Sequence, residues 1–378
     1  MNNAAKMLFL LVAALCGVLL AGCDREPTAA PLAVRELLSA PAAGFERAIA
    51  PRPFDFPTDH GPHPGFRDEW WYATGNLRSD DGRRSDGRRF GFQITFFRHQ
   101  LRPGAGAGWD SPQAYMAHFA LSDIDGDRYH HFERFGRPGA DVAGARTSPF
   151  AVWLDGWRLA SIGADFAPLT LQAEAGAVAL DLRLEPTVRP ILQGEHGLSR
   201  KNAESGNASY YYSLPRIEAH GRVRDADGRE HTVRGLVWLD REWSSSALGR
   251  EQAGWDWFAL QPDDGPALMY YQLRRADGSA DRFSAGRLIA ADGSSVPLTP
   301  EQVQLQPQQH WTSPAGQRYP IAWRLRIPQH GVDWQVRAAL PQQWFDASFR
   351  YWEGAVEITR SEDGKPLGSG YLEMTGYE

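Results

Sequence analysis

The chain has 378 residues and a formal net charge of −6, from 40 lysines and arginines against 46 aspartates and glutamates. Because this mildly acidic sequence has no basic cluster, it is a poor match for nucleic acid or for an anionic lipid surface. Its length allows two domains with cores of their own. Its 14 Trp, 18 Phe and 12 Tyr indicate wide cores or apolar pockets.

The N-terminal residues 1–22 have the pattern of a secretory signal, with Lys6 ahead of an apolar run over 8–20. The run closes on Leu20-Ala21-Gly22-Cys23, which resembles a bacterial lipobox, in which the cysteine is lipidated and becomes the mature N-terminus. An ordinary cleaved signal, with Cys23 as a bystander, is the alternative. A membrane-spanning helix is disfavoured because the run is shorter than the ~20 residues that a span needs.

Residues 23–50 contain Pro27, Pro31 and Pro41 and are expected to tether the folded part to a membrane. We therefore expect a lipoprotein of the cell envelope that faces the periplasm, and whether it sits in the inner or the outer membrane is left open. Since Cys16 leaves with the signal and the other cysteine is lipidated, no disulfide is available.

Beyond the tether, the sequence favours strands over helices. Apolar and polar residues alternate over 90–96, 178–184 and 321–327, which is the period of a strand with one buried face. Nine Asp-Gly pairs, among them Asp125-Gly126 and Asp227-Gly228, mark tight hairpins. Many short antiparallel strands joined by hairpins predict an all-β fold of barrels or sandwiches.

The domain boundary is predicted in a polar stretch over 244–252, which gives an N-terminal domain at 51–246 and a C-terminal domain at 247–378. Two segments, 103–111 and 185–209, are rich in Gly, Pro or charge and poor in apolar residues. We expect both to be long loops, which in compact domains often form lids or mouths.

Three clusters place carboxylates among large aromatic side chains. They are Asp68-Glu69-Trp70-Trp71-Tyr72, Asp240-Arg241-Glu242-Trp243 and Trp255-Asp256-Trp257-Phe258. Acids in such surroundings can have raised pKa values and act as general acids, or hold the polar end of a ligand. The alternative for each acid alone is exposure to water or pairing with an arginine. Three such clusters together favour one shared site.

Strand alternation predicts which side chains of the second cluster share a face. Trp238, Asp240 and Glu242 point to one side of the strand, and Arg241 and Trp243 point to the other. Two neighbouring carboxylates repel each other and raise one pKa, which would supply a proton donor. Alternatively, an arginine of the same or a neighbouring strand neutralises both acids.

Other catalytic patterns are sparse. His118 lies in an apolar strand, where a hydrogen-bonded core residue is a commoner role than contact with a ligand. His60-x-x-His63 and His130-His131 lack the ligand set of a zinc site, so no metal is expected. The sequence has no Gly-x-Ser-x-Gly elbow and no phosphate-binding glycine loop, and no cofactor is expected. These absences disfavour serine, cysteine and nucleotide enzymes but leave acid–base chemistry open.

The acid–aromatic clusters belong to a longer series of motifs that resembles the bacterial AttH/CrtC-like family, related to carotenoid 1,2-hydratases and often labelled predicted secreted hydrolases. The matching stretches are Asp68–Leu77, Ser209–Ser213, Gly235–Trp243, Trp255–Phe258, Tyr351–Gly354 and Gly370–Tyr377. Together they span nearly all of residues 55–378. The resemblance implies two tandem lipocalin-like antiparallel β-barrels, the first ending near the Asp-x-x-Trp motif.

One departure from the hydratase pattern concerns the proton donor. In that pattern the Asp-x-x-Trp motif carries a His, and a downstream Tyr-x-Asp provides the acid that protonates the alkene. Here the corresponding positions hold Arg241 and Tyr270-Tyr271-Gln272. An amide does not donate a proton as a carboxylic acid does, so the resemblance does not carry over hydration by the same residues.

These observations lead to two functional hypotheses of different classes. The first is a membrane-anchored periplasmic lipoprotein that binds or carries an apolar, lipid- or isoprenoid-like ligand, with an envelope transporter as a candidate partner. The alternative is an enzyme, either a hydro-lyase of the carotenoid hydratase type or a secreted hydrolase acting on an apolar substrate. A third hypothesis, a structural spacer in an envelope complex, requires well-filled barrels without a pocket.

The candidate residues follow from the clusters and the family motifs. The catalytic candidates are Asp240, Glu242, Tyr270 and Asp256. The ligand-binding candidates are Glu69, Trp70, Trp71, Tyr72, His118, Arg241, Trp243, Trp255, Trp257 and Gln272. Because an eight-stranded barrel holds one small ligand in its interior, we expect the ligand inside the first barrel, among Trp70, Trp71, Phe92 and Phe96.

Lipidation of Cys23 is the first testable prediction. Cys23→Ala removes the acceptor of the acyl chains, of which two or more are needed for stable anchoring. The variant should therefore leave the membrane fraction, as measured by cell fractionation together with mass spectrometry of the N-terminal peptide. A wild-type peptide without acyl mass, combined with a variant that stays in the membrane fraction, would refute the localisation.

Overall fold

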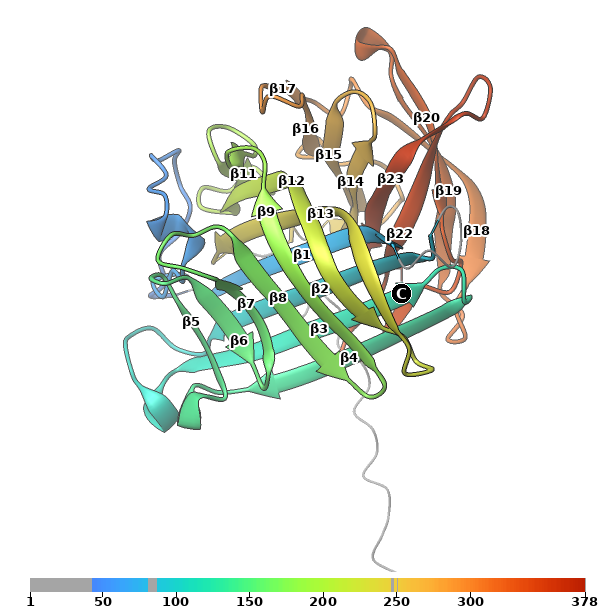
Figure 1. The fold of residues 1–378 in the computed structure, drawn as a ribbon. Coiled ribbons are helices and arrows are strands. Elements are labelled where there is room, and N and C mark those ends of the chain that lie inside the picture. Colours follow the sequence, from blue (N-terminus) through green and yellow to red (C-terminus); the bar gives the residue numbers. More distant parts are fainter. Residues whose placement is uncertain (1–42, 81–86, 246–247, 250, 378) are drawn as a thin grey trace, which may run out of the picture. The chain divides into compact units, whose positions relative to one another are not determined.

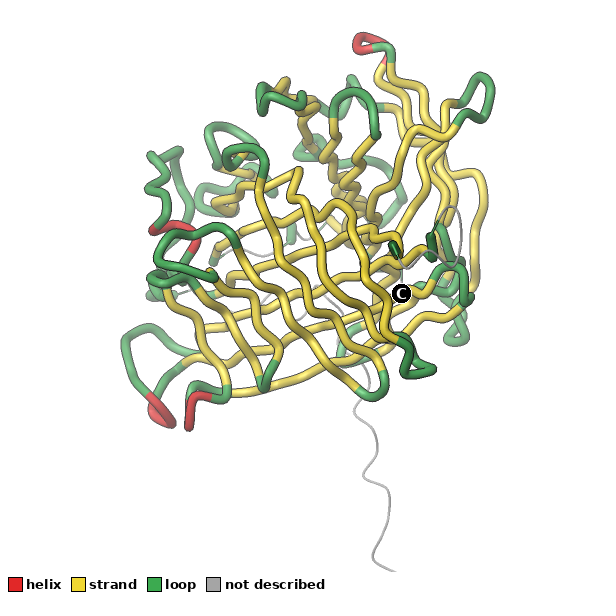
Figure 2. Tube along the Cα trace, viewed as in Figure 1, coloured by secondary structure: helices red, strands yellow, loops and turns green. Residues whose placement is uncertain are grey.

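The structure is a computed structural model that describes residues 43–80, 87–245, 248–249 and 251–377. The expected signal, the lipidation site at Cys23 and most of the tether lie outside the described residues. The described residues belong to one compact unit. Among the described residues, no helix has the length and apolar character needed to cross a bilayer. Figure 2 shows that strands dominate the described chain.

The first sheet has 13 antiparallel strands and curls into a nearly closed barrel (Figure 1). Its strands follow the order β4-β3-β2-β1-β13-β12-β9-β8-β7-β6-β5, and the short β10 and β11 pair with β12. Their bounds are β1 Asp68–Ser79, β2 Arg89–Gln100, β3 Gln113–Asp123, β4 Arg128–Gly136, β5 Ala143–Arg146, β6 Ala151–Leu154, β7 Trp157–Ser161, β8 Leu169–Ala175, β9 Val178–Pro186, β10 Ile191–Leu192, β11 Leu198–Arg200, β12 Ala208–Arg224 and β13 Glu230–Ser244.

The second sheet has 10 antiparallel strands and forms a half-barrel, with β17 and β18 at its open edges. Its order is β17-β16-β15-β14-β23-β22-β20-β19-β18, and β21 pairs with β22. The bounds are β14 Gln252–Pro262, β15 Ala267–Arg275, β16 Ala285–Ile289, β17 Ser295–Leu298, β18 Gln304–Thr312, β19 Arg318–Ile327, β20 Val332–Ala338, β21 Trp344–Asp346, β22 Arg350–Arg360 and β23 Pro366–Met374.

The only helices among the described residues are four short 3-10 turns. They are η1 Thr58–His60, η2 Gly108–Asp110, η3 Gly139–Asp141 and η4 Pro328–His330. The prediction of an all-β antiparallel fold is therefore confirmed, with a half-barrel in the second position.

The local predictions also agree with the structure, with one exception. The alternating segments 90–96, 178–184 and 321–327 lie in β2, β9 and β19. Asp125-Gly126 turns between β3 and β4, and Asp227-Gly228 turns between β12 and β13. The exception is the expected loop over 185–209, because part of it forms β10 and β11 against β12.

Aromatic and aliphatic side chains fill the interior of the first barrel. Trp71, Phe92 and Phe96 are at most 1 % exposed and belong to one continuous core. These three rings therefore fill the space that was expected to hold a ligand, whereas Trp70 of the same expected set lines the cavity described below. A second core, which includes Phe258 and Trp323, fills the concave side of the half-barrel.

The two sheets meet through the outer face of the first barrel. Tyr72 and Trp238 on that face pack with Trp257 and Tyr371 of the half-barrel in a third core. Polar contacts also cross the junction, since Asn76 Nδ2 donates to the carbonyl of Gly370 over 3.0 Å. The junction is therefore a third packed region, separate from the two cores.

At Gly91 of β2 the two sheets approach each other closely. A Cβ atom at this position would lie 2.7 Å from the Cβ of Ala355 on β22, and neither atom belongs to a flexible side chain. We predict that Gly91→Val lowers the free energy of unfolding by ~1–3 kcal/mol in urea titrations, because overpacking forces the sheets apart. As the control, Gly163→Val, at a site with open space around it, should change the stability much less.

Candidate active site at the sheet junction

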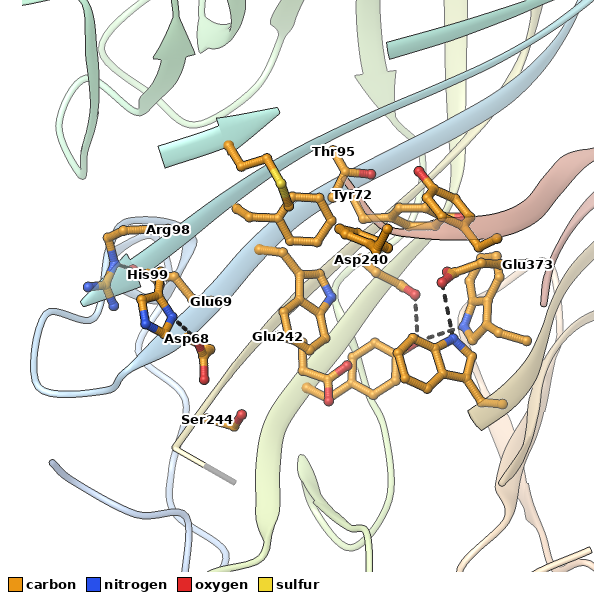
Figure 3. Close-up of a pocket in the computed structure, with 18 of the residues that line it drawn as sticks. Asp68, Glu69, Tyr72, Thr95, Arg98, His99, Asp240, Glu242, Ser244 and Glu373 are labelled. Atoms are coloured by element: carbon orange, nitrogen blue, oxygen red, sulfur yellow. Dashed lines mark hydrogen bonds and ion pairs between the residues drawn. The ribbon is translucent and has the colours of Figure 1, made fainter. Parts of the chain in front are cut away.

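A cavity of about 330 Å³ lies between the outer face of the first barrel and the half-barrel (Figure 3). Its walls are mainly apolar and aromatic, and several carboxyl groups reach it. The lining residues are Asp68, Glu69, Trp70, Tyr72, Thr95, Phe97, Arg98, His99, Ala114, Tyr115, Met116, Phe135, Lys201, Tyr211, Asp240, Glu242, Ser244, Leu248, Trp255, Trp257, Tyr271, Leu273, Phe349, Tyr351, Glu353 and Glu373. Such a composition is typical of small-molecule sites.

Asp240 on β13 reaches the cavity and accepts three hydrogen bonds. Ser213 Oγ and Trp238 Nε1 donate to Oδ1 over 2.5 Å and 2.7 Å, and the Tyr211 hydroxyl donates to Oδ2. Burial raises the pKa of Asp240 to about 7, although these three donors lower it. Glu242 adds to the rise through its negative charge. Asp240 therefore changes its protonation state near neutral pH.

Glu353 and Glu373 lie opposite each other in the register of β22 and β23. The Tyr72 hydroxyl donates to Glu353 Oε1 over 2.6 Å, and Trp255 Nε1 donates to Glu373 Oε1 over 3.1 Å. Burial raises the pKa of both carboxyl groups, and the charge of Glu373 raises that of Glu353 further. Because like charges face each other in an apolar setting, at least one of the pair holds a proton at neutral pH.

Glu242 differs from these three acids because a cation reaches it. Lys201 Nζ lies 2.9 Å from Glu242 Oε1, and the Ser209 hydroxyl donates to the same oxygen. Burial alone would lower the pKa of Lys201, but Glu242 and Tyr271 raise it above its usual value. The alternative of neutralisation by an arginine does not describe this acid, because its partner is Lys201, whereas Arg241 pairs with Glu69.

Glu69 lines the cavity, but its carboxylate is engaged elsewhere. Arg98 Nε donates to Oε1, and Arg241 Nη2 lies 2.9 Å from Oε2. Burial alone would raise the pKa of Glu69, but these two guanidinium groups hold it well below its usual range. The same arginines also bind backbone carbonyls, including that of Gly61 by Arg241 and that of Phe66 by Arg98. This cluster therefore fixes the segment ahead of β1 against the barrel.

The structure brings half of the predicted residues to the cavity. The cavity-lining members are Glu69, Trp70, Tyr72, Asp240, Glu242, Trp255 and Trp257. The remaining seven, Trp71, His118, Arg241, Trp243, Asp256, Tyr270 and Gln272, do not line it. Strand alternation accounts for most of this division, because successive side chains of a strand point to opposite faces. Trp71 and Trp243 thus belong to the barrel core.

Alternation also turns three candidates of β14 and β15 away from the cavity. Tyr271 lines it, so Tyr270 and Gln272 lie on the opposite side, and Tyr270 is part of the half-barrel core. Asp256 is paired with Arg274 over 2.7 Å and accepts a hydrogen bond from the Tyr377 hydroxyl over 2.8 Å. These placements remove all three side chains from contact with a ligand in this cavity.

His118 lies one layer behind the cavity wall. Its Nδ1 lies 2.7 Å from the hydroxyl of Tyr351, which lines the cavity, and its Nε2 lies 2.9 Å from Glu133 Oε1. Burial lowers the pKa of His118, although Glu133 opposes this change. The geometry gives His118 a role in holding Tyr351.

Sequence reasoning missed several polar residues of the cavity. Glu353 and Glu373 lie in stretches that carry the family resemblance, and Lys201 and Tyr211 lie in or beside the expected loop. The sequence feature that could have identified the two glutamates is a single acid in an otherwise apolar end of a strand, as in Tyr371-Leu372-Glu373-Met374. Within the described part of the chain, no group of three or more His, Cys, Asp or Glu could hold a metal ion.

A barrel and a half-barrel with an acid-lined cavity at their junction define the structural class of this protein. The chain belongs to the AttH-like family, whose family model matches residues 47–377. The resemblance inferred from the motifs is thereby confirmed. A comparison with curated proteins gave no match.

Solved structures show the same fold. A crystal structure of a protein from Nitrosomonas europaea described as AttH is 37 % identical, with a TM-score of 0.77, and the match covers 88 % of this chain and 100 % of that one. Kievitone hydratase from Nectria haematococca has 15 % identity and a TM-score of 0.65, with coverage of 88 % and 96 %. CghA has 14 % identity and a TM-score of 0.51, with coverage of 88 % and 95 %.

The Glu69 cluster generates a stability prediction. Glu69→Gln leaves two buried guanidinium groups without their anion, so the free energy of unfolding should fall by about 3 kcal/mol or more. Because the pKa of Glu69 is lowered on folding, its contribution is complete above its usual value of 4.5 and is lost as the pH falls below that value. Urea titrations at neutral and acidic pH should therefore show a difference that narrows in acid.

The matched control for this prediction is Glu185→Gln. Glu185 pairs with Arg183 over 2.6 Å on the exposed surface, where water screens the two charges, so this pair should contribute little to stability. If the two glutamine variants have equal stability, the buried cluster does not hold the segment ahead of β1.

Proposed function

We propose that this protein is a hydro-lyase that binds an apolar, unsaturated small molecule in the junction cavity and adds water across a carbon–carbon double bond. The observation that carries the proposal is the convergence of Asp240, Glu353 and Glu373 on one mainly apolar cavity. Among the described residues, no lysine or arginine forms an ion pair with any of the three. Acids in this state can donate and accept protons near neutral pH.

The three acids have environments suited to two different roles. Asp240 accepts three hydrogen bonds, which favour its carboxylate and make it the candidate base. Glu373 accepts one bond, from Trp255, and faces Glu353, so its protonated form is favoured. Unlike Glu353, Glu373 is only partly buried, which makes it the candidate proton donor.

The proposed reaction adds the elements of water in two steps. Glu373 gives its proton to one carbon of the double bond, and the positive charge that develops on the other carbon lies beside aromatic rings. A water molecule then forms the C–O bond, and the Asp240 carboxylate takes the proton that this water releases. Loss of that proton to solvent and reprotonation of Glu373 complete the cycle.

Aromatic side chains supply the surroundings that this charge requires. Tyr72 and Trp257 are in edge contact with centroids 5.1 Å apart, and Trp257 Nε1 donates to the Tyr211 hydroxyl over 3.1 Å. All three line the cavity. One structural neighbour is named as a hydratase, which is consistent with the proposal. The amide at Gln272 does not exclude hydration, because Asp240, Glu353 and Glu373 line the cavity and can exchange protons instead.

The cellular setting remains the one expected from the N-terminal sequence. We infer a lipoprotein of the envelope that is anchored through Cys23, with an apolar substrate that partitions into membranes. A carrier that binds such a molecule without converting it is the second candidate, and it differs from the enzyme in lacking turnover. The spacer hypothesis requires well-filled barrels without a pocket. The first barrel is filled, but the cavity at the junction is evidence against this hypothesis.

The substitution Glu373→Gln tests the proposed hydratase activity and the role of Glu373 as its proton donor. The wild-type protein, incubated with a panel of polyenes and prenylated phenols in oxygen-labelled water, should give a product with one added labelled water. Glu373→Gln keeps the shape but removes the acid, so turnover should be lost while the affinity stays within about tenfold. Glu357→Gln, an exposed site on β22, is the control and should keep full activity.

The pH dependence of the rate distinguishes the proposed base, Asp240, from the proposed acid, Glu373. The plot of kcat/KM should rise with a pKa near 7 as Asp240 ionises and fall at higher pH as the Glu353–Glu373 pair loses its proton. Asp240→Asn should abolish the acidic limb together with most of the rate. Binding without product for every panel member would favour the carrier, and full activity of Glu373→Gln would remove this residue from the mechanism.

A further inference from the structure

Four apolar side chains are exposed at one end of the first barrel, on the loop between β2 and β3 and around the segment that joins β4 to β5. Trp109 is 69 % exposed and Leu101 56 %, and both belong to the loop between β2 and β3. Phe135, at the end of β4, is 62 % exposed, and Val142, ahead of β5, is 38 % exposed. Single exposed apolar residues are ordinary, but four on two neighbouring loops form a patch.

Contacts between the two loops hold this patch together. The indole of Trp109 lies so close to Gly139 that a Cβ atom there would be 2.3 Å from the ring. Arg137 Nη2 donates to the carbonyl of Ser111 over 2.6 Å. Figure 1 accordingly shows η2 and η3 side by side at the lower left. These contacts hold the two loops, and therefore their exposed apolar side chains, in fixed positions relative to each other.

The patch is continuous with the mouth of the cavity. Phe135 lines the cavity and is largely exposed, so its ring belongs both to the patch and to the cavity wall. Met116, opposite Phe135 in the register of β3 and β4, lines the cavity as well. An apolar molecule that lies against the patch has an apolar route into the cavity.

The described chain begins beside the same loop. A Cβ atom on Gly44 would lie 2.8 Å from Pro103 Cγ in the β2–β3 loop. In sequence, Cys23 is only 20 residues ahead of Ala43. At the maximum extension of a peptide chain, such a stretch spans about 70 Å. A membrane anchor at this cysteine therefore connects to the protein at the end that carries the patch.

We propose that Leu101, Trp109, Phe135 and Val142 form a membrane-docking surface that places the cavity mouth against a lipid bilayer and admits an apolar substrate directly from it. The inference deepens the proposed function and rests on it for the nature of the substrate. Trp and Phe are suited to the bilayer interface because their rings are mainly apolar. With a net charge of −6, the chain must dock by burying apolar surface, so salt should have little effect.

Site-specific labels test the docking. The mature sequence has no cysteine besides Cys23, so Trp109→Cys introduces a unique thiol once Cys23 is acylated. The full-length protein, labelled there with an environment-sensitive fluorophore and reconstituted in phosphatidylcholine vesicles, should show blue-shifted emission that nitroxide-labelled lipids quench. Val296→Cys, at a 46 % exposed site on β17, is the control and should show neither effect.

The quenching measured at the two labelled positions either supports or overturns the docking surface. Quenching at position 109 that persists in high salt, with none at position 296, supports the docking surface. Equal quenching at both positions, or none at position 109, overturns it. These outcomes do not depend on turnover, so they remain decisive even if the protein proves to have no hydratase activity.

A transfer assay tests the route into the cavity. The probe is cis-parinaric acid, a fatty acid with a polyene chain, whose fluorescence is quenched in nitroxide-containing vesicles and recovers when it enters the protein. Trp109→Asp should slow the recovery about tenfold, as expected for losing the burial of one large aromatic side chain. Its affinity for the probe added from ethanol should not change, and Val296→Asp should match the wild type. A normal transfer rate for Trp109→Asp would overturn the route.

Discussion

The site depends on strands that are buried on both faces. In β13, every residue from Val237 to Ser244 is buried, and most of β1 is buried as well. Alternate side chains of these strands therefore belong to two different environments. One set fills the barrel core, and the other faces the half-barrel and lines the cavity. Asp240, the proposed base, reaches the cavity because of its position in this alternation.

The same constraint explains what the sequence could and could not predict. Period-two patterns and Asp-Gly turns identified the strand type and most hairpins, and alternation within 238–243 correctly grouped Asp240 with Glu242. Alternation does not reveal which face is the core when both faces are apolar, so Trp71 and Trp70 were equally plausible ligand contacts. Tyr270 follows from the Tyr-x-Asp pattern of the hydratases, but its neighbour Tyr271 is the tyrosine that lines the cavity.

Long-range pairing accounts for the remaining differences. Glu353 and Glu373 become a pair only through the register of β22 and β23, and they meet Asp240 only because the two sheets pack together. The acids also differ in whether a cation pairs with them. Glu69 and Asp256 have arginine partners, and Glu242 is paired with Lys201. No local pattern shows which acids remain without such a partner. That distinction arises entirely from tertiary structure.

The half-barrel leaves two strand edges open, and such edges can recruit strands from other molecules. The edge strands β17 and β18 each contain a proline, Pro297 and Pro307, which lacks the N–H that a new strand would need. The pairing of β18 with β19 is also irregular between Pro307 and His310. The two open edges of the half-barrel are thus protected against edge-to-edge aggregation.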